Sequence, residues 1–204
     1  DTDRSRGLGD VYKRQILGFL SVIILGSILL MLPVATRDGK GAVCSDALFT
    51  ATSAVCVTGL VIHDTATYWS MFGQSVILFL IQIGGMGIVT VAVSVAAFSG
   101  RKIGLMQRST MQEAVSAHHV GGIVRLTKFI LKTSVCIELI GTALLLPAFI
   151  RDFGITKGLW YALFHSVSAF CNAGFDLLTA TPGAVGLSEY TNNPLVMITL
   201  IVLI

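Results

Sequence analysis

Residues 47–60 read ALFTATSAVCVTGL, and residues 162–175 read ALFHSVSAFCNAGF. The two stretches align without a gap and share seven of fourteen positions, so one short element occurs twice, 115 residues apart. Each copy is a short apolar segment that ends in a small-residue turn with glycine, between two long apolar segments. Membrane proteins place non-helical backbone at bilayer depth mainly where it lines a cavity or a filter. The repeat therefore predicts an internally duplicated membrane protein, as is common among transporters.

The composition indicates a membrane protein. Apolar residues make up 54% of the chain and charged residues 12%, and the mean hydropathy is +0.83, whereas a soluble domain carries about 25% charge. Apolar segments near the length of about 20 residues that a span requires lie at 16–32, 71–98 and 131–150, and another begins at 194. We expect an all-α polytopic membrane protein built from repeated span–pore-loop–span units.

The two copies divide the chain into four parts. The parts are an N-terminal tail at 1–15, a first repeat at 16–98, a basic loop at 99–119 and a second repeat at 120–204, truncated in its last span. The polar tail is either cytoplasmic or not native to the protein, and we place no function there. A short helix is expected before each turn, at 44–54 and at 157–169. Since the sequence does not begin with Met, we expect a fragment of a longer protein.

Basic residues predict the orientation, because cytoplasmic loops are enriched in Lys and Arg. The segment between the repeats and its flanks carry Arg101, Lys102, Arg108, Arg125, Lys128 and Lys132. The segments that hold the turns carry four basic and six acidic residues, among them Asp64 and Asp176. We therefore expect the turns to face outside, where both acids would attract cations through a screened field. The sequence pI of about 8.8 then reflects topology and does not indicate nucleic-acid binding.

The turns have the features of an ion filter. A dehydrated monovalent cation needs oxygens in place of water, and rings of backbone carbonyls supply them in potassium-selective filters. Glycine tolerates the backbone conformation that this needs, and Gly59 and Gly174 match in the two copies. We expect potassium to be held mainly by the backbone carbonyls of Cys56, Val57, Thr58, Gly59, Cys171, Asn172, Ala173 and Gly174. Two loops do not close a four-sided pore, so further loops or subunits would be required.

Four stretches carry a family resemblance. They are residues 47–60, FGQSVILFLIQIGGMGI at 72–88, GRKIGLMQR at 100–108 and ALFHSVSAFCNAGFDL at 162–177. These stretches resemble the pore-forming subunit of the Ktr branch of the Trk/Ktr/HKT potassium transporters, over nearly the whole chain from residue 16. The resemblance implies four repeats of the potassium-channel-like type around one pore. Two of the four are present here, the second incomplete, and the intramembrane gate would lie in the missing part.

The resemblance implies more about function. Members of this branch take up potassium across the bacterial cytoplasmic membrane, with the pore loops facing outside. They form homodimers in the lipid bilayer and bind a cytoplasmic ring of nucleotide-sensing RCK subunits. Sodium accompanies or stimulates uptake in several members, and no cofactor is permanently bound. Some plant relatives with Ser at the position of Gly59 prefer sodium, so the glycine here favours potassium.

Several polar or small residues in the spans leave alternatives open. Glu138 is ionisable and lies within a span, where such a group is by default a functional candidate; it is equally a structural partner for a neighbouring helix. Gln82 would face either the pore or another helix. The run of glycines at 84–87 favours close helix packing over a dinucleotide fingerprint. Cys56 and Cys171 match in the repeat, which would suit a disulfide but favours small side chains packed behind a turn.

Two other classes of function compete with a pore. A non-conducting membrane scaffold would keep the same loops, and only ion flux would distinguish it. A membrane-embedded enzyme would need a nucleophile and a base, and Ser168 with His165 is the available combination. His165 has no counterpart in the first copy, where Thr50 stands. This asymmetry argues for packing, and we expect no enzymatic activity.

Overall fold

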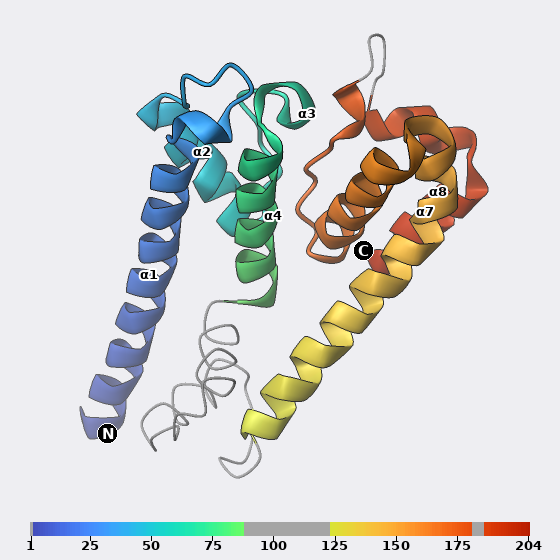
Figure 1. The fold of residues 1–204 in the computed structure, drawn as a ribbon. Helices are drawn as coiled ribbons and strands as arrows, with labels where there is room; N and C mark the ends of the chain where they lie inside the picture. The colour runs from blue at the N-terminus through green and yellow to red at the C-terminus, as the bar shows by residue number, and fades with distance from the viewer. Residues whose placement is uncertain (1, 88–122, 181–185) are drawn as a thin grey trace. The chain divides into compact units, whose positions relative to one another are not determined.

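The computed structural model describes residues 2–87, 123–180 and 186–204 (Figure 1). Its helices are α1 (Thr2–Leu30), α2 (Cys44–Val55), α3 (Thr65–Tyr68), α4 (Met71–Met86), α7 (Ile123–Phe170) and α8 (Pro194–Leu203), with short 3-10 helices η1 (Pro33–Ala35), η2 (Leu178–Ala180) and η3 (Gly186–Asn192). Within these ranges the only β pairing is an isolated bridge between Thr36 and Trp69. The predicted all-α class is confirmed for the described residues, and the fourfold repeat organisation stays a prediction.

The chain divides into two compact units. One comprises residues 1–21 and 86–135, and the other comprises residues 22–85 and 136–204. The first unit holds the start of α1, which runs as helix through the expected N-terminal tail, and the start of α7. The second unit holds both copies of the repeated element. The basic loop at 99–119 lies outside the described residues, so the predicted orientation is not tested.

The long helix α7 is two helices joined at a sharp bend. Gly154 has φ 78° and ψ 174° inside it, a left-handed backbone that glycine accommodates without a steric penalty. Gly158 then lies so close to Ile150 that an added Cβ would be 2.8 Å from the Ile150 backbone. Figure 1 shows the yellow part of α7 and the orange part that returns from the bend. The returning part carries the second copy of the repeated element.

Large apolar side chains lie on the outside of the helices. Residues 128–170 form a helical stretch long and apolar enough to cross a membrane, and shorter apolar helices cover 15–30, 71–86 and 194–203. Ile16 is 65% exposed and Val202 78% exposed. A water-soluble surface rarely carries extended apolar patches, whereas lipid tails are as apolar as these side chains. This pattern agrees with a membrane location.

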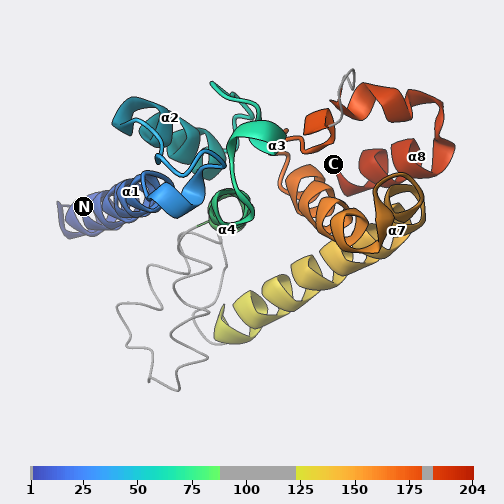
Figure 2. The ribbon, with the colours of Figure 1, turned by 45° about the horizontal axis from the view of Figure 1, so that its top comes forward.

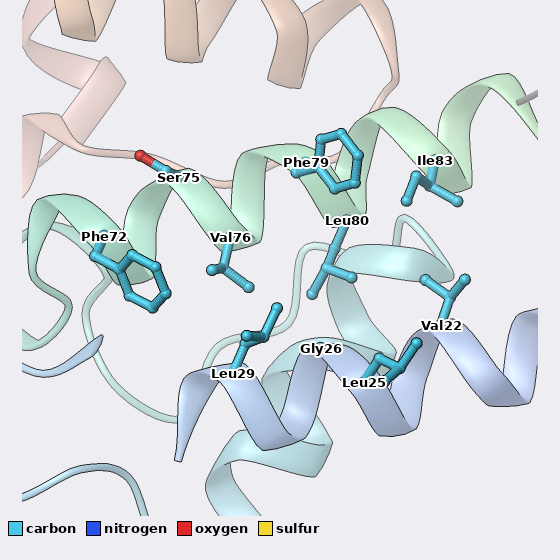
Figure 3. A pocket seen from close by; sticks show the side chains of 10 residues that line it. All are labelled: Val22, Leu25, Gly26, Leu29, Phe72, Ser75, Val76, Phe79, Leu80 and Ile83. Carbon is cyan, nitrogen blue, oxygen red and sulfur yellow. The ribbon is translucent and has the colours of Figure 1, made fainter. Parts of the chain in front are cut away.

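Helices α1 and α4 pack through an apolar contact. An added Cβ on Gly26 of α1 would lie 2.7 Å from the Leu80 side chain, so the glycine lets the two helices approach. Figure 3 shows Leu29 of α1 on the side facing Phe72 and Val76 of α4. A cleft of about 350 Å³ remains between these helices, and Ser75 is its one polar lining residue. Figures 1 and 2 both show α2 beside the C-terminal end of α1.

The glycines near the end of α4 are packing positions. An added Cβ on Gly84 would collide with the carbonyl oxygen of Val55, the last residue of α2, and one on Gly85 would lie 2.5 Å from Sγ of Cys171. The interpretation of these two glycines as sites of close helix packing is therefore confirmed. One turn of α4 supports the beginnings of both repeated turns.

Gly84→Ala should destabilise the protein by about 1–3 kcal/mol, the usual penalty for forcing extra atoms into a packed site. The atom in the way is a backbone oxygen, which does not move aside as a flexible side chain would. The measurement is thermal unfolding of the purified protein in detergent. Ser75→Ala is the control, because Ser75 is exposed on the same helix. Equal melting temperatures for the two variants would contradict this packing.

Candidate functional site: the paired loops

The two helices that precede the turns end in the same hydrogen-bonded motif. In the first copy Val57 N–H donates to Ala54 O (3.3 Å) and Thr58 N–H donates to Ser53 O (3.0 Å). In the second copy the matching bonds are Asn172 to Ala169 (2.9 Å) and Ala173 to Ser168 (2.7 Å). This pair of bonds is the Schellman arrangement, which satisfies the last helical carbonyls. The backbone therefore leaves both helices in the same conformation.

The backbone of the two turns matches residue by residue. Val57 and Asn172 have φ of 56° and 57°, and Gly59 and Gly174 both have φ of 72°. Asparagine tolerates left-handed backbone, but a β-branched residue in this region is a genuine outlier. Such strain persists only where the surroundings impose it, and it concentrates at functional sites. The left-handed backbone at Val57 is therefore imposed by its surroundings, against the preference of a β-branched residue for negative φ.

Matching serines hold each turn from behind. Ser53 Oγ and Thr58 Oγ1 are 2.9 Å apart, and Ser168 Oγ donates to Phe175 O at 2.9 Å. Both serines are 4% exposed. Ser53 connects its helix to a side chain within the turn, whereas Ser168 connects its helix to the backbone directly after the turn, so the matching serines bond at different points.

The two turns meet through their backbones. An added Cβ on Gly59 would lie 2.6 Å from the carbonyl oxygen of Ala173 and 3.4 Å from Cα of Gly174. The reverse approach is looser, since a Cβ on Gly174 would be 3.6 Å from Gly59 Cα. The eight predicted filter residues thus form two adjoining loops, Cys56–Gly59 and Cys171–Gly174. Whether they hold an ion stays a prediction.

The field at this junction suits a cation. Both preceding helices end at the loops, so the negative ends of their dipoles lie there. Neither helix has a basic residue in its last turn that would oppose a positive ion. Among the described residues, no cluster of three or more His, Cys, Asp or Glu side chains forms a metal-ion cage.

The matching cysteines are free thiols, so the disulfide considered from the sequence is not formed. Cys171 is buried against Gly85, in agreement with a small side chain packed behind the turn. Cys56 is exposed. The packing interpretation therefore holds for the second copy and is wrong for the first.

The arrangement of Ser168 and His165 does not suit hydrolysis. Ser168 donates to a backbone carbonyl. His165 is 1% exposed, with Nδ1 2.8 Å from Tyr161 O and Nε2 2.9 Å from Asp176 Oδ1. A nucleophile needs a base within hydrogen-bond reach, whereas these contacts direct both groups to other partners.

Asp176 is a hydrogen-bonded carboxylate, and its role as a charge at the mouth stays a prediction. Besides His165, it accepts hydrogen bonds from the N–H groups of Leu178 (2.7 Å) and Leu187 (2.8 Å). Burial alone would raise the pKa of Asp176, but the hydrogen bonds from His165 and from the two N–H donors hold it below its usual value. Asp64 caps α3 by accepting from Thr67 N–H at 2.8 Å, so it also has a structural partner.

Glu138 and Gln82 bond to one another. Gln82 Nε2 donates to Glu138 Oε1 at 2.7 Å, and Glu138 is 5% exposed. The main-chain carbonyl of Glu138 accepts from Ser166 Oγ at 2.7 Å and from Thr142 Oγ1 at 2.7 Å. Of the alternatives left open by the sequence, the structure therefore favours helix contact for both residues.

Sequence reasoning missed the pairing of histidines with acids around the turns. His165 bonds to Asp176, and His63 Nε2 lies 2.8 Å from Asp46 Oδ2. The repeat gave no signal for these pairs, because their members stand at positions that do not match in the two copies.

Comparison with known proteins defines the class. The family model TrkH, described as cation transport protein, matches residues 13–204. The class of protein is thus a membrane cation transporter. The chain belongs to the TrkH family of cation transport proteins, and within the Trk/Ktr group it is KtrB-like.

Three relatives show where the similarity lies. The potassium/sodium uptake protein NtpJ of Enterococcus hirae is 44% identical, over 89% of this chain and 39% of the relative. The Ktr system potassium uptake protein B of Bacillus subtilis is 46% identical, over 79% and 36%. The protein of the same name from Vibrio alginolyticus is 36% identical, over 98% and 42%. The chain thus spans about two fifths of these relatives, which are all named for ion uptake.

Val57→Asn should stabilise the protein and Asn172→Val should destabilise it, each by about 1 kcal/mol, the scale of left-handed strain in a residue with a Cβ. The two positions match and share the same φ within one degree, so each substitution copies the residue of the other loop. Thermal unfolding of the purified protein measures both changes. Shifts of the same sign would show that side-chain contacts outweigh backbone strain.

Proposed function

We propose that this chain forms part of the pore of a potassium-uptake system, with the loops Cys56–Gly59 and Cys171–Gly174 as two sides of a backbone-carbonyl filter. The observation that carries the proposal is the matched left-handed backbone of two loops that contact each other. The names of the relatives, all potassium or potassium/sodium uptake proteins, support the choice of ion.

The backbone shape suits ion coordination for a chemical reason. Helix carbonyls are occupied by internal hydrogen bonds, and in a strand successive peptide groups face opposite sides. In each loop a left-handed residue is followed two positions later by a left-handed glycine. This departure from both regular structures frees carbonyls to gather around an ion that has lost its water.

Uptake needs no energy-coupling site in this part of the chain. One positive charge that descends a membrane potential of 100 mV gains about 2.3 kcal/mol. The helix ends at the loops add a favourable field where the ion would dehydrate. Sodium is the candidate coupled ion, because one relative is named as a potassium/sodium uptake protein.

The partners proposed from the resemblance are a second copy of the chain and a cytoplasmic nucleotide-binding RCK subunit. Two further loops, supplied by the rest of the protein, would complete the filter. The protein expressed from the complete gene should then be a dimer by light scattering in detergent. An added RCK subunit should elute together with it in size-exclusion chromatography.

Gly59→Ser should reduce the preference for potassium over sodium by about tenfold, given about 1–2 kcal/mol of strain for a residue with a Cβ in left-handed backbone. The new Cβ would also press on the Ala173 carbonyl. Gly174→Ser is the matched control. It has the same φ, but its Cβ meets only ordinary contact, so its effect should be smaller.

The assay is rubidium uptake, and its inhibition by sodium, in cells that lack their own potassium uptake and express the complete gene. Equal sodium inhibition of Gly59→Ser and the parent protein would contradict the filter assignment. An abundant parent protein that carries no rubidium, with or without an RCK subunit, would favour the non-conducting scaffold.

A further inference from the structure

In each copy, a histidine–aspartate pair ties the segment that leaves the loop to the helix that enters it. In the first copy Asp46 lies in the first turn of α2, and His63 follows Gly59 by four residues. In the second copy the order is reversed, because His165 lies in the helix and Asp176 follows Gly174 by two residues. The bonds measure 2.8 Å and 2.9 Å.

The two pairs differ in burial. His63 is 35% exposed and stacks on Tyr68 with ring centroids 4.0 Å apart, and its partner Asp46 also accepts from Ser45 Oγ. His165 is 1% exposed and its Nδ1 lies 2.8 Å from Tyr161 O, whereas the two aspartates are alike in exposure, Asp46 at 22% and Asp176 at 25%. The difference in burial therefore lies in the histidines. An ion pair at the surface contributes little, because water screens it. A buried, fully bonded pair fixes the geometry of its neighbours.

The second pair is bonded on every side. Asp176 binds His165 through Oδ1, which also accepts from Leu178 N–H, and Oδ2 accepts from Leu187 N–H. An added Cβ on Gly186 would collide with Oδ2, so the chain also closes around the carboxylate. The carboxylate therefore joins the returning helix, the segment after the loop and the start of η3.

Hydrogen bonds of this network fix the backbone next to the second filter loop. Phe175 O accepts from Ser168 Oγ, and Asp176 Oδ1 bonds to His165 Nε2. The backbone directly after Gly174 is thus fixed from both sides. The carbonyl of Ala173, which approaches Gly59, lies three residues before Asp176.

We infer that His165 and Asp176 are positioning residues that hold the second loop in register with the first and so determine ion selectivity, whereas His63 and Asp46, a pair whose histidine is partly exposed, do not. The inference rests on the proposed filter. By this inference, the two loops differ because the His165–Asp176 network holds only the second one.

The test uses the protein expressed from the complete gene and the rubidium uptake assay, with uptake corrected for the amount of protein in the membrane. Asp176→Ala should reduce the preference for potassium over sodium by about tenfold or more, because it removes the acceptor of three hydrogen bonds and one bond to a charged group already corresponds to about tenfold. Asp176→Asn should keep part of the preference, because its amide oxygen can still accept from His165 and Leu178 N–H, whereas its NH2 group faces the Leu187 N–H and cannot accept from it. Asp46→Ala should leave the preference within about twofold, the scale of an exposed ion pair.

His165→Leu provides an independent variant from the other side of the bond. It should relax selectivity as Asp176→Ala does, and the double variant should lose less than the sum of the two single changes, because both remove the bond between His165 and Asp176. A merely structural role would lower the amount of protein in the membrane and leave the ion preference unchanged.

The outcomes separate this inference from the proposed function. If the parent protein selects potassium and Gly59→Ser relaxes that selectivity, but Asp176→Ala and His165→Leu do not, the positioning role is overturned and the filter stands. A loss in Asp176→Ala that disappears at high ionic strength would overturn it in favour of a simple charge at the mouth, because salt screens such a charge. A parent protein with no preference between the ions would overturn both.

Discussion

The contact between Gly59 and the Ala173 carbonyl is the constraint on which the described site depends. Two chain segments that come this close leave no room for a side chain between them. Three features hold the two backbones against each other. They are the identical helix endings, the serines that bond to each turn, and Gly84 and Gly85 of α4. Packing of this kind gains little from hydrophobic burial, so its accuracy comes from hydrogen bonds whose geometry is directional.

The sequence predicted the parts of the structure that follow from composition and periodicity. The scarcity of charge gave the helical membrane class, and α8 begins at Pro194, where the fourth apolar segment was expected. The duplicated motif gave both loops and both of their glycines. These features were accessible because each depends on residue types at fixed spacings along the chain.

Other features depend on contacts that the chain order does not encode. Glycine was expected to carry the unusual backbone, yet Val57 and Asn172 carry it as well, because the helix ending imposes it whatever the residue. The sequence predicts Asp176 only as a charge at the mouth, whereas the chain also returns over it and supplies an N–H donor. The bond of Gln82 to Glu138 joins residues 56 apart, and a single sequence gives no sign of it.

The reversed order of the two histidine–aspartate pairs bears on how far the duplicated halves can replace each other. His165 corresponds to Thr50 in the first copy, and Asp176 corresponds to Val61. Grafting residues 47–60 onto positions 162–175 would keep every residue that the repeat shares and still leave Asp176 without its buried partner. The two copies share their backbone conformation but differ in the side-chain hydrogen bonds that hold it. Neither copy can therefore replace the other.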